Sequence, residues 1–255
     1  MRRLLQIVLL LLVVLPAVVL LWLSLAKEIG YPSFFESSFT FDFWKNVFTG
    51  GEGLLKSLLW SLGIAFFVAF VSTVFGFIIS KKMASSDFGQ RSLQLAYLPY
   101  LIAPVVLGAM LQFYFTRLGW TGSVIGVMMA QLIFIMPYAV LVFSGFWTPH
   151  IKQLAFQATT LGASNHYVLR HIVLPVARSW FFLTFSQCFL ISWFEYGITE
   201  LIGVGKVQTL TIKSMVYVKE SSPQYGAVAA CMMIIPVLLL FVINSRVFLK
   251  KEVEA

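Results

Sequence analysis

Six long apolar stretches dominate this sequence and leave little polar chain between them. They cover residues 4–26, 54–80, 93–115, 124–146, 180–203 and 225–248. A helix needs about 20 apolar residues to cross a bilayer, and each stretch has that length. The stretches are continuous and do not alternate between polar and apolar residues, which favours helices over a membrane barrel. The sequence therefore predicts an all-α integral membrane protein with six transmembrane helices.

The composition excludes the other broad classes. Hydrophobic residues make up 60% of the chain and charged residues only 11%, whereas a soluble domain carries about a quarter charged residues. Disordered chains are poor in aromatic and branched apolar residues, so disorder is excluded as well. The net charge is +8, and the basic residues lie mainly at the ends of apolar runs, as they do in membrane proteins. Membrane lipid is therefore an expected partner and nucleic acid is not. Cys188 and Cys231 lie within apolar runs and predict neither a disulfide nor a zinc site.

The first stretch, 4–26, has two interpretations. A signal peptide ending at the small residue Ala26 is one, but a secretory apolar core is usually about 7–15 residues long. An uncleaved first helix is therefore favoured. With its N-terminus inside, most Lys and Arg residues fall in cytoplasmic segments, and the positive-inside rule then places both termini in the cytoplasm. The whole chain, 1–255, is predicted to be one transmembrane domain.

The longest predicted cytoplasmic loop, 147–179, holds most of the functional information. No Pro or Gly interrupts residues 151–158, so a short helix is expected there. Its apolar face follows from the i, i+4, i+7 spacing of Leu154, Ala158 and Leu161. Gly162 permits a turn, and a helical pattern resumes at 165–173. The loop is thus expected to form a helix, a glycine turn and a second helix.

In this loop, Gly162 is followed by nine residues and then by Ile172-Val173-Leu174-Pro175. This spacing resembles the EAA loop of binding-protein-dependent ABC importer permeases, which reads Glu-Ala-Ala, three residues, Gly, nine residues, Ile-x-Leu-Pro. The family's Glu-Ala-Ala falls on Phe156-Gln157-Ala158, so its glutamate is missing here. An ionic contact by that glutamate is therefore not expected, but hydrophobic docking is. Gly76, Pro99 and Pro104 also resemble the core of the family.

The resemblance implies a permease subunit of a type I ABC importer in the bacterial inner membrane. It also implies three kinds of partner: two copies of an ATP-binding subunit, a second permease subunit that is identical or different, and an extracytoplasmic substrate-binding protein. The coupling loop between the fourth and fifth helices would dock into the ATPase. The implied docking residues are Phe156, Gln157, Ala158, Leu161, Gly162, Ala163, Ser164 and His166. The alternative is an ordinary amphipathic loop that packs on its own bundle.

No catalytic, cofactor or metal site is expected in this chain. Neither Gly203-Val204-Gly205-Lys206 nor Gly51-Glu52-Gly53 has the spacing of a phosphate-binding P-loop. The partner ATPase would therefore bind ATP and Mg and hydrolyse the nucleotide. His150, His166 and His171 all lie in the cytoplasmic loop, but without a nearby carboxylate they are expected to be solvated or docking residues.

Polar residues inside the apolar stretches are candidates for a translocation path: Glu195, Gln187 and Gln131. Gln187 and Glu195 are eight residues apart, so they would share a face of the fifth helix. A charge at mid-bilayer costs roughly 2.5–3.5 kcal/mol and usually faces a cavity or a partner. Glu195 would favour a cation, and the stretch from Phe194-Glu195 to Pro223 resembles the spermidine/putrescine permease group most. Alternatively, Glu195 pairs with the partner permease or is a structural residue near the outer interface.

Two other classes of membrane protein remain as alternatives. One is a secondary transporter, although such proteins often contain internal repeats and none is evident in this sequence. The other is an assembly or scaffold protein without a transport role. The sequence does not select a substrate.

Overall fold

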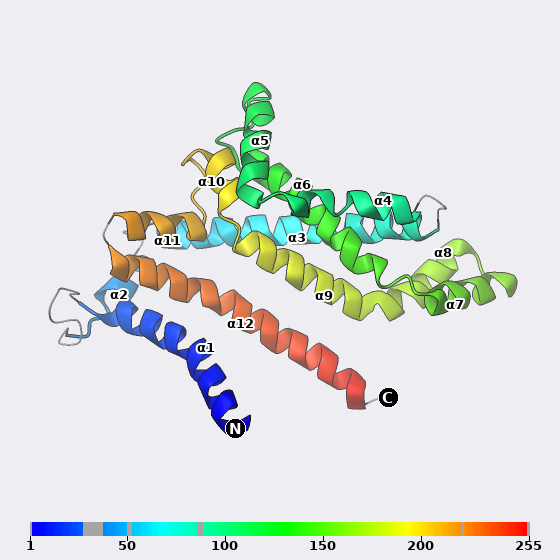
Figure 1. The fold of residues 1–255 in the computed structure, drawn as a ribbon, viewed down its shortest axis with the longest axis horizontal. Helices are drawn as coiled ribbons and strands as arrows, with labels where there is room; N and C mark the ends of the chain where they lie inside the picture. Colours follow the sequence, from blue (N-terminus) through cyan, green and yellow to red (C-terminus); the bar gives the residue numbers. More distant parts are fainter. Residues whose placement is uncertain (1, 28–37, 50–52, 86–88, 221, 254–255) are drawn as a thin grey trace. The chain divides into compact units, whose positions relative to one another are not determined.

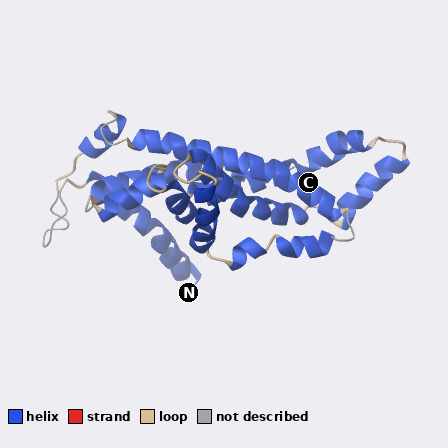
Figure 2. Cartoon of the chain, turned by 90° about the horizontal axis from the view of Figure 1, so that it is seen from above, coloured by secondary structure: helices blue, strands red, loops and turns tan. Residues whose placement is uncertain are grey.

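The computed structural model describes residues 2–27, 38–49, 53–85, 89–220 and 222–253. In these ranges all regular secondary structure is helical, apart from one isolated antiparallel β-bridge between Ala26 and Phe39. Figures 1 and 2 show that the described chain is helical over most of its length. The expectation of an all-α protein is confirmed. The expected cytoplasmic position of both termini concerns Met1, Glu254 and Ala255. These residues lie outside the described residues.

Four described helical segments are long and apolar enough to cross a membrane. These are Leu54–Ala84 (α3), Val124–Ser144 (α6), Asn165–Trp193 and the Pro223–Ser245 part of α12, which extends over Pro223–Val253. The helices Leu93–Leu101 and Pro104–Arg117 are bent relative to each other, and if they form one span together, the number of candidate spans rises to five. Helix α1, Arg2–Leu25, contributes a shorter apolar part, Val14–Leu25. The protein therefore crosses the membrane several times, and the number of six crossings stays a prediction.

The third predicted helix, 93–115, is divided in the structure. It consists of α4 (Gly89–Leu95), the 3-10 helix η1 (Leu98–Leu101) and α5 (Pro104–Arg117), and the axis bends by 97° between η1 and α5. Ala103 has an extended backbone with φ −60° and ψ 140°. The ring of Pro104 disfavours helical backbone at the preceding residue, so the helix stops there. The expectation of one helix over 93–115 is corrected to the three short elements α4, η1 and α5, with a sharp bend before α5.

The fifth predicted helix, 180–203, also differs from the structure. One continuous helical segment runs from Asn165 to Trp193 through α8 (Asn165–Val168), the π-helix η2 (Leu169–Val173) and α9 (Leu174–Trp193). Pro175 lacks a backbone N–H, and the π turn directly before it accommodates the carbonyl that an α-helix would leave unpaired. The chain then breaks after Trp193 and forms the separate short helix α10, Gly197–Gly203. The helix thus begins and ends earlier than predicted.

The described chain contains two compact units, of which the first comprises residues 1–62 and 208–239. Its helices include α1, the short α2 (Asp42–Phe48) and α11 (Leu210–Lys219). Side-chain hydrogen bonds join the segments of this unit. Trp44 Nε1 donates to Ser24 Oγ over 3.3 Å, and the backbone N–H of Leu210 donates to Ser61 Oγ over 2.7 Å.

The second unit comprises residues 63–207 and 240–255 and contains the candidate sites. Its α3 and α6 approach each other closely, because a Cβ added to Gly76 would lie only 2.5 Å from the Cβ of Ala139. Next to this contact, the rings of Phe77 and Phe143 pack edge to face with centroids 5.3 Å apart. Gly76 therefore has a packing role, which explains why a glycine stands at this position in the helix.

Candidate functional sites

The loop after α6 forms helix α7 (Pro149–Thr160), a four-residue turn and helix α8, as the sequence predicts. Gly162 has a φ of +91°, which only glycine adopts readily. The N–H of Gly162 donates to the carbonyl of Thr159, and the N–H of Ala163 donates to that of Ala158. These two bonds form a Schellman motif that satisfies the last carbonyls of α7. Figure 1 shows α7 and α8 projecting beyond the ends of α6 and α9.

One face of α7 packs against the rest of the second unit through an aromatic cluster. Phe77, Phe143 and Phe146 are the buried aromatic residues of this cluster, and Ile151, Ala155 and Ala158 of α7 pack against it. Of the predicted face, Ala158 packs as expected, whereas Ile151 and Ala155 are the other packed residues of α7 instead of Leu154 and Leu161. The expected member Leu161 lies past the end of α7, at the C-cap position, and its side chain is exposed.

Two hydrogen bonds add to this attachment. The indole Nε1 of Trp147 donates to Ser80 Oγ over 3.0 Å, and Lys152 Nζ donates to the carbonyl of Ala84 over 2.8 Å. Both acceptors lie near the C-terminal end of α3. The helix–turn–helix is thus held by packing and by polar contacts on one side, and Ala163 of the turn also packs against the cluster, while Leu161 beside it is exposed.

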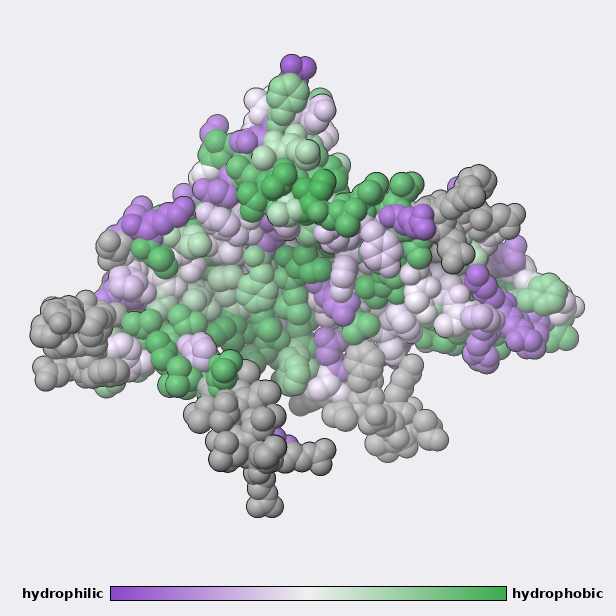
Figure 3. Space-filling model, viewed as in Figure 1, coloured by the Kyte–Doolittle hydropathy of each residue, from purple (hydrophilic) through white to green (hydrophobic). Residues whose placement is uncertain are grey.

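The turn and the adjoining part of α7 expose apolar side chains. Leu161 is 88% exposed and Phe156 is 67% exposed. Four of the other predicted docking residues are exposed, namely Gln157, Gly162, Ser164 and His166. The remaining two, Ala158 and Ala163, are half-buried. Figure 3 shows hydrophilic residues gathered around the α7–α8 end of the molecule. Large apolar side chains in a polar setting are typical of a surface that binds another protein.

Glu195 lies in the break between α9 and α10, and its carboxylate is bound by the chain itself. Oε1 accepts a hydrogen bond from the N–H of Ile198 over 2.7 Å, and Oε2 accepts from the N–H of Thr199 over 2.9 Å and from Thr199 Oγ1 over 2.6 Å. The side chain is 8% exposed. Because the first N–H groups of a helix have no partner within the helix, this carboxylate acts as a cap of α10.

Gln131 extends this network from α6. Its Nε2 donates to Thr199 Oγ1 over 2.9 Å, and its Oε1 accepts from Ser192 Oγ over 2.5 Å. Gln131 is 1% exposed, so the network is a buried connection between α6, α9 and α10. Thr199 and Ser192 were not among the predicted site residues. Both residues lie in an apolar run, and their positions in the sequence follow no pattern that distinguishes them from Ser and Thr residues that only pack between helices.

Gln187 belongs to a different contact. Since α9 ends at Trp193, Glu195 does not continue the helix face of Gln187, and the prediction that the two share a face is wrong. The amide oxygen of Gln187 instead accepts from Tyr138 Oη over 3.1 Å. Tyr100 packs beside Tyr138 with ring centroids 6.3 Å apart. The two tyrosines were missed by sequence reasoning, although a phenol hydroxyl within an apolar run is a polar signal that the sequence contains.

Among the residues that the structure describes, no group of three or more His, Cys, Asp and Glu side chains is arranged to hold a metal ion. The ring of His171 stacks on Tyr167 with centroids 4.3 Å apart, and its Nδ1 lies 3.2 Å from the carbonyl oxygen of Tyr167. These contacts are local to α8 and η2.

The sequence from residue 72 to residue 251 matches the family described as binding-protein-dependent transport system inner membrane component. The match covers both candidate sites, and the chain belongs to this family of transport-system permeases. The resemblance in the loop is therefore confirmed at the level of the family, and the members are transport subunits, not enzymes.

The chain is similar to curated permeases of two substrate classes. It is 25% identical to the probable sulfate transport system permease protein cysT of Chlorella vulgaris, over 78% of this chain and 82% of the relative. It is 25% identical to the chloroplastic sulfate permease 2 of Chlamydomonas reinhardtii, over 69% of this chain and 51% of that protein. It is 22% identical to the spermidine/putrescine permease protein PotC of Haemophilus influenzae, over 84% and 83% of the two chains.

Proposed function

We propose that this chain is the permease subunit of an ATP-driven importer and that it forms the translocation path for the substrate. The observation that carries the proposal is the helix–turn–helix of α7 and α8, which packs against the aromatic cluster on one side and presents Phe156 of α7 and Leu161 of the turn to solvent. An element that transmits motion between subunits needs a fixed attachment on one side and a free contact surface on the other. A loop that only packed on its own bundle would bury these two side chains.

The turn docks into a groove of a cytoplasmic ATPase subunit. The contact is formed by the exposed side chains of the turn, with Ala158 and Ala163 at its base. Because Phe156 stands where the family pattern has glutamate, the contact here is mainly apolar. Two ATPase subunits bind and hydrolyse ATP with Mg, and this chain carries no cofactor. A second permease subunit and an extracytoplasmic substrate-binding protein complete the importer.

The chain forms a single transmembrane domain in a bacterial inner membrane, with six crossings and both termini in the cytoplasm. Helix α1 supplies the first crossing and the bent α4–α5 region the third. The distribution of Lys and Arg supports this orientation, because the C-terminal end of α3 and the start of α9 carry the basic residues Lys81, Lys82 and Arg178.

Within the translocation path, Glu195 and Gln131 shape the path and Gln187 contacts the substrate. The carboxylate of Glu195 already accepts three hydrogen bonds, so it offers little to a passing cation. Tyr138 occupies the amide oxygen of half-buried Gln187. No hydrogen bond is made by the Gln187 amide nitrogen within the described part of the chain. A free N–H donor suits an oxyanion such as sulfate better than a polyamine, so the oxyanion is the favoured substrate class.

The proposal is tested by co-purification and by one variant of the turn. The full chain, tagged at its C-terminus, is expected to bring an ATPase subunit with it, whereas a secondary transporter or a scaffold would not. Leu161→Asp places a charge in an apolar groove and is expected to abolish substrate-stimulated ATPase activity by weakening docking. Gln153→Asp on the exposed side of α7 is the control with a new charge outside the turn. Full stimulation in Leu161→Asp would contradict the coupling role.

A further inference from the structure

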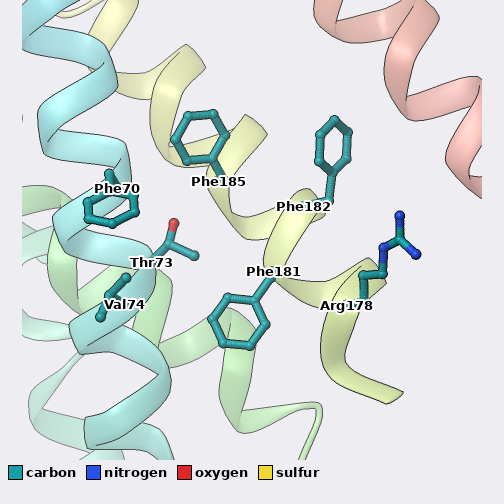
Figure 4. A pocket seen from close by; sticks show the side chains of 7 residues that line it. All are labelled: Phe70, Thr73, Val74, Arg178, Phe181, Phe182 and Phe185. Atoms are coloured by element: carbon teal, nitrogen blue, oxygen red, sulfur yellow. The ribbon is translucent and has the colours of Figure 1, made fainter. Parts of the chain in front are cut away.

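A groove with a volume of about 400 Å³ lies between α3 and α9. Figure 4 shows its lining residues from the two helices: Phe70, Thr73 and Val74 from α3, and Arg178, Phe181, Phe182 and Phe185 from α9. Thr73 donates its hydroxyl to the carbonyl of Ala69 over 2.7 Å, so the walls offer almost no polar group. The volume falls in the range of about 300–1,000 Å³ that ligand pockets have. Walls of this kind fit a hydrocarbon chain.

Arg178 supplies a positive charge to this apolar groove. It lies four residues before Phe182, so the two side chains share a face of α9, and Figure 4 shows both on the same side of the helix. Arg178 is exposed, and among the described residues it makes no hydrogen bond or ion pair. A guanidinium in this position is free to bind an anion from outside the chain.

Lys81 on α3 adds a second charge at the same end. It follows Val74 by seven residues, which places it on the face of α3 that lines the groove. The two helices meet where the ring centroids of Phe77 and Phe181 are 4.6 Å apart. Lys81 lies one turn beyond Phe77, and Arg178 lies about one turn before Phe181, so both cations are at one end of the groove.

The groove end carries no opposing charge from the described residues of its own unit. In this unit, the carboxylates whose side chains the structure describes are Glu195 and Glu200, and both lie beyond the other end of α9. The arrangement is therefore a hydrocarbon-lined groove that ends in two cations with no described carboxylate opposite them. Basic side chains near a helix end extend their charge to the level of the lipid headgroups.

We infer that this groove binds an anionic phospholipid, with an acyl chain against the phenyl rings and the phosphate at Arg178 and Lys81. A second copy of this chain is a poorer occupant, because the chain has 18 basic and 10 acidic residues and would bring further positive charge to the site. The cytoplasmic leaflet, where the proposed orientation places these cations, contains anionic lipid. The site thus matches the lipid that surrounds it.

The inference is tested by native mass spectrometry of the purified full-length permease with added phosphatidylglycerol or phosphatidylcholine. Arg178→Gln is expected to lower the retention of phosphatidylglycerol roughly five-fold, the effect of one basic residue near an anionic surface, and to leave phosphatidylcholine unchanged. Arg178→Lys keeps the charge and should retain most of the binding. Arg170→Gln removes an exposed arginine outside the groove and should have no effect. Val74→Phe fills the groove and should lower retention of both lipids.

A cross-linking experiment identifies the occupant directly. A photoreactive phenylalanine analogue at position 182, in the permease complex reconstituted with phosphatidylglycerol, is expected to form a lipid adduct. An adduct with a second permease chain would overturn the inference, because the groove would then be a protein interface. Equal phosphatidylglycerol retention in the wild type, Arg178→Gln and Val74→Phe would overturn it as well.

Discussion

At the scale of single residues, Glu195 illustrates how a buried charge is satisfied in a membrane protein. A carboxylate without partners inside a bilayer is costly, but three donors from α10 bind this one over 2.6–2.9 Å. From the sequence, the same residue is predicted to favour a cation, since both roles require an acidic residue in an apolar stretch. The difference lies in the helix break at Phe194, which turns the side chain toward the free N–H groups of α10.

Glu195→Gln separates the two roles. The amide keeps one acceptor oxygen but replaces Oε2 with a donor that cannot accept from Thr199, so the variant should lose about 1–3 kcal/mol of stability. We expect a lower melting temperature and lower complex yield, with normal uptake per assembled permease. Glu200→Gln, at a half-buried position on α10, is the control and should melt like the wild type. Abolished uptake with an unchanged melting temperature would instead make Glu195 a substrate-binding residue.

Gly162 gives a second prediction at this scale. A Cβ at this position meets nothing within 4 Å, so Gly162→Ala acts only through its φ of +91°, at a cost of about 1–2 kcal/mol. We expect the turn to change shape and substrate-stimulated ATPase activity to fall. Gly119→Ala, also at positive φ (+70°) with open space around it, is the matched control. Equal activity in both variants would show that the turn has no special role.

At the scale of elements, the loop was more predictable than the helix that follows it. The turn follows from local signals: Pro149 starts α7, Gly162 ends it, and Ser164 caps α8 by accepting from the N–H of Tyr167. The end of α9 has no such signal, because apolar residues continue through the break. The cap by Glu195 depends on hydrogen bonds that form only after the chain has turned, so hydrophobicity alone predicts one longer helix.

The attachment of α7 to α3 gives a prediction for this element. Trp147→Phe removes the N–H that donates to Ser80 and should cost about 1 kcal/mol. The ring still packs in the aromatic cluster, so we expect a more mobile loop, faster proteolysis within α7 and weaker coupling to ATP hydrolysis. Trp180→Phe is the control, since Trp180 packs against the same cluster and has no hydrogen bond among the described residues. Identical proteolysis of both variants would exclude a role for the Trp147 hydrogen bond.

At the scale of the whole molecule, apolar length predicts where the chain can cross the membrane but not how helices pair. The runs at 54–80 and 124–146 reappear as α3 and α6. The bend at Ala103 and the close approach at Gly76 depend on backbone geometry and on the neighbouring helix. The candidate path was predicted only in part for the same reason: Gln131 and Glu195 share one network, and Gln187 lies in another.

The proposed six crossings give the last prediction. Reporter fusions at the inner positions, Lys82, Ser179 and Ala255, should be active in the cytoplasm, and fusions at the outer positions, Thr49, Gly119 and Gln208, should be active outside. The physical reason is that basic segments resist translocation across the membrane. Paired reporters that are active on opposite sides serve as mutual controls. An exterior signal at Ser179 would place the α7–α8 turn outside, where no ATPase can bind it, and would exclude both the six-crossing topology and the coupling role.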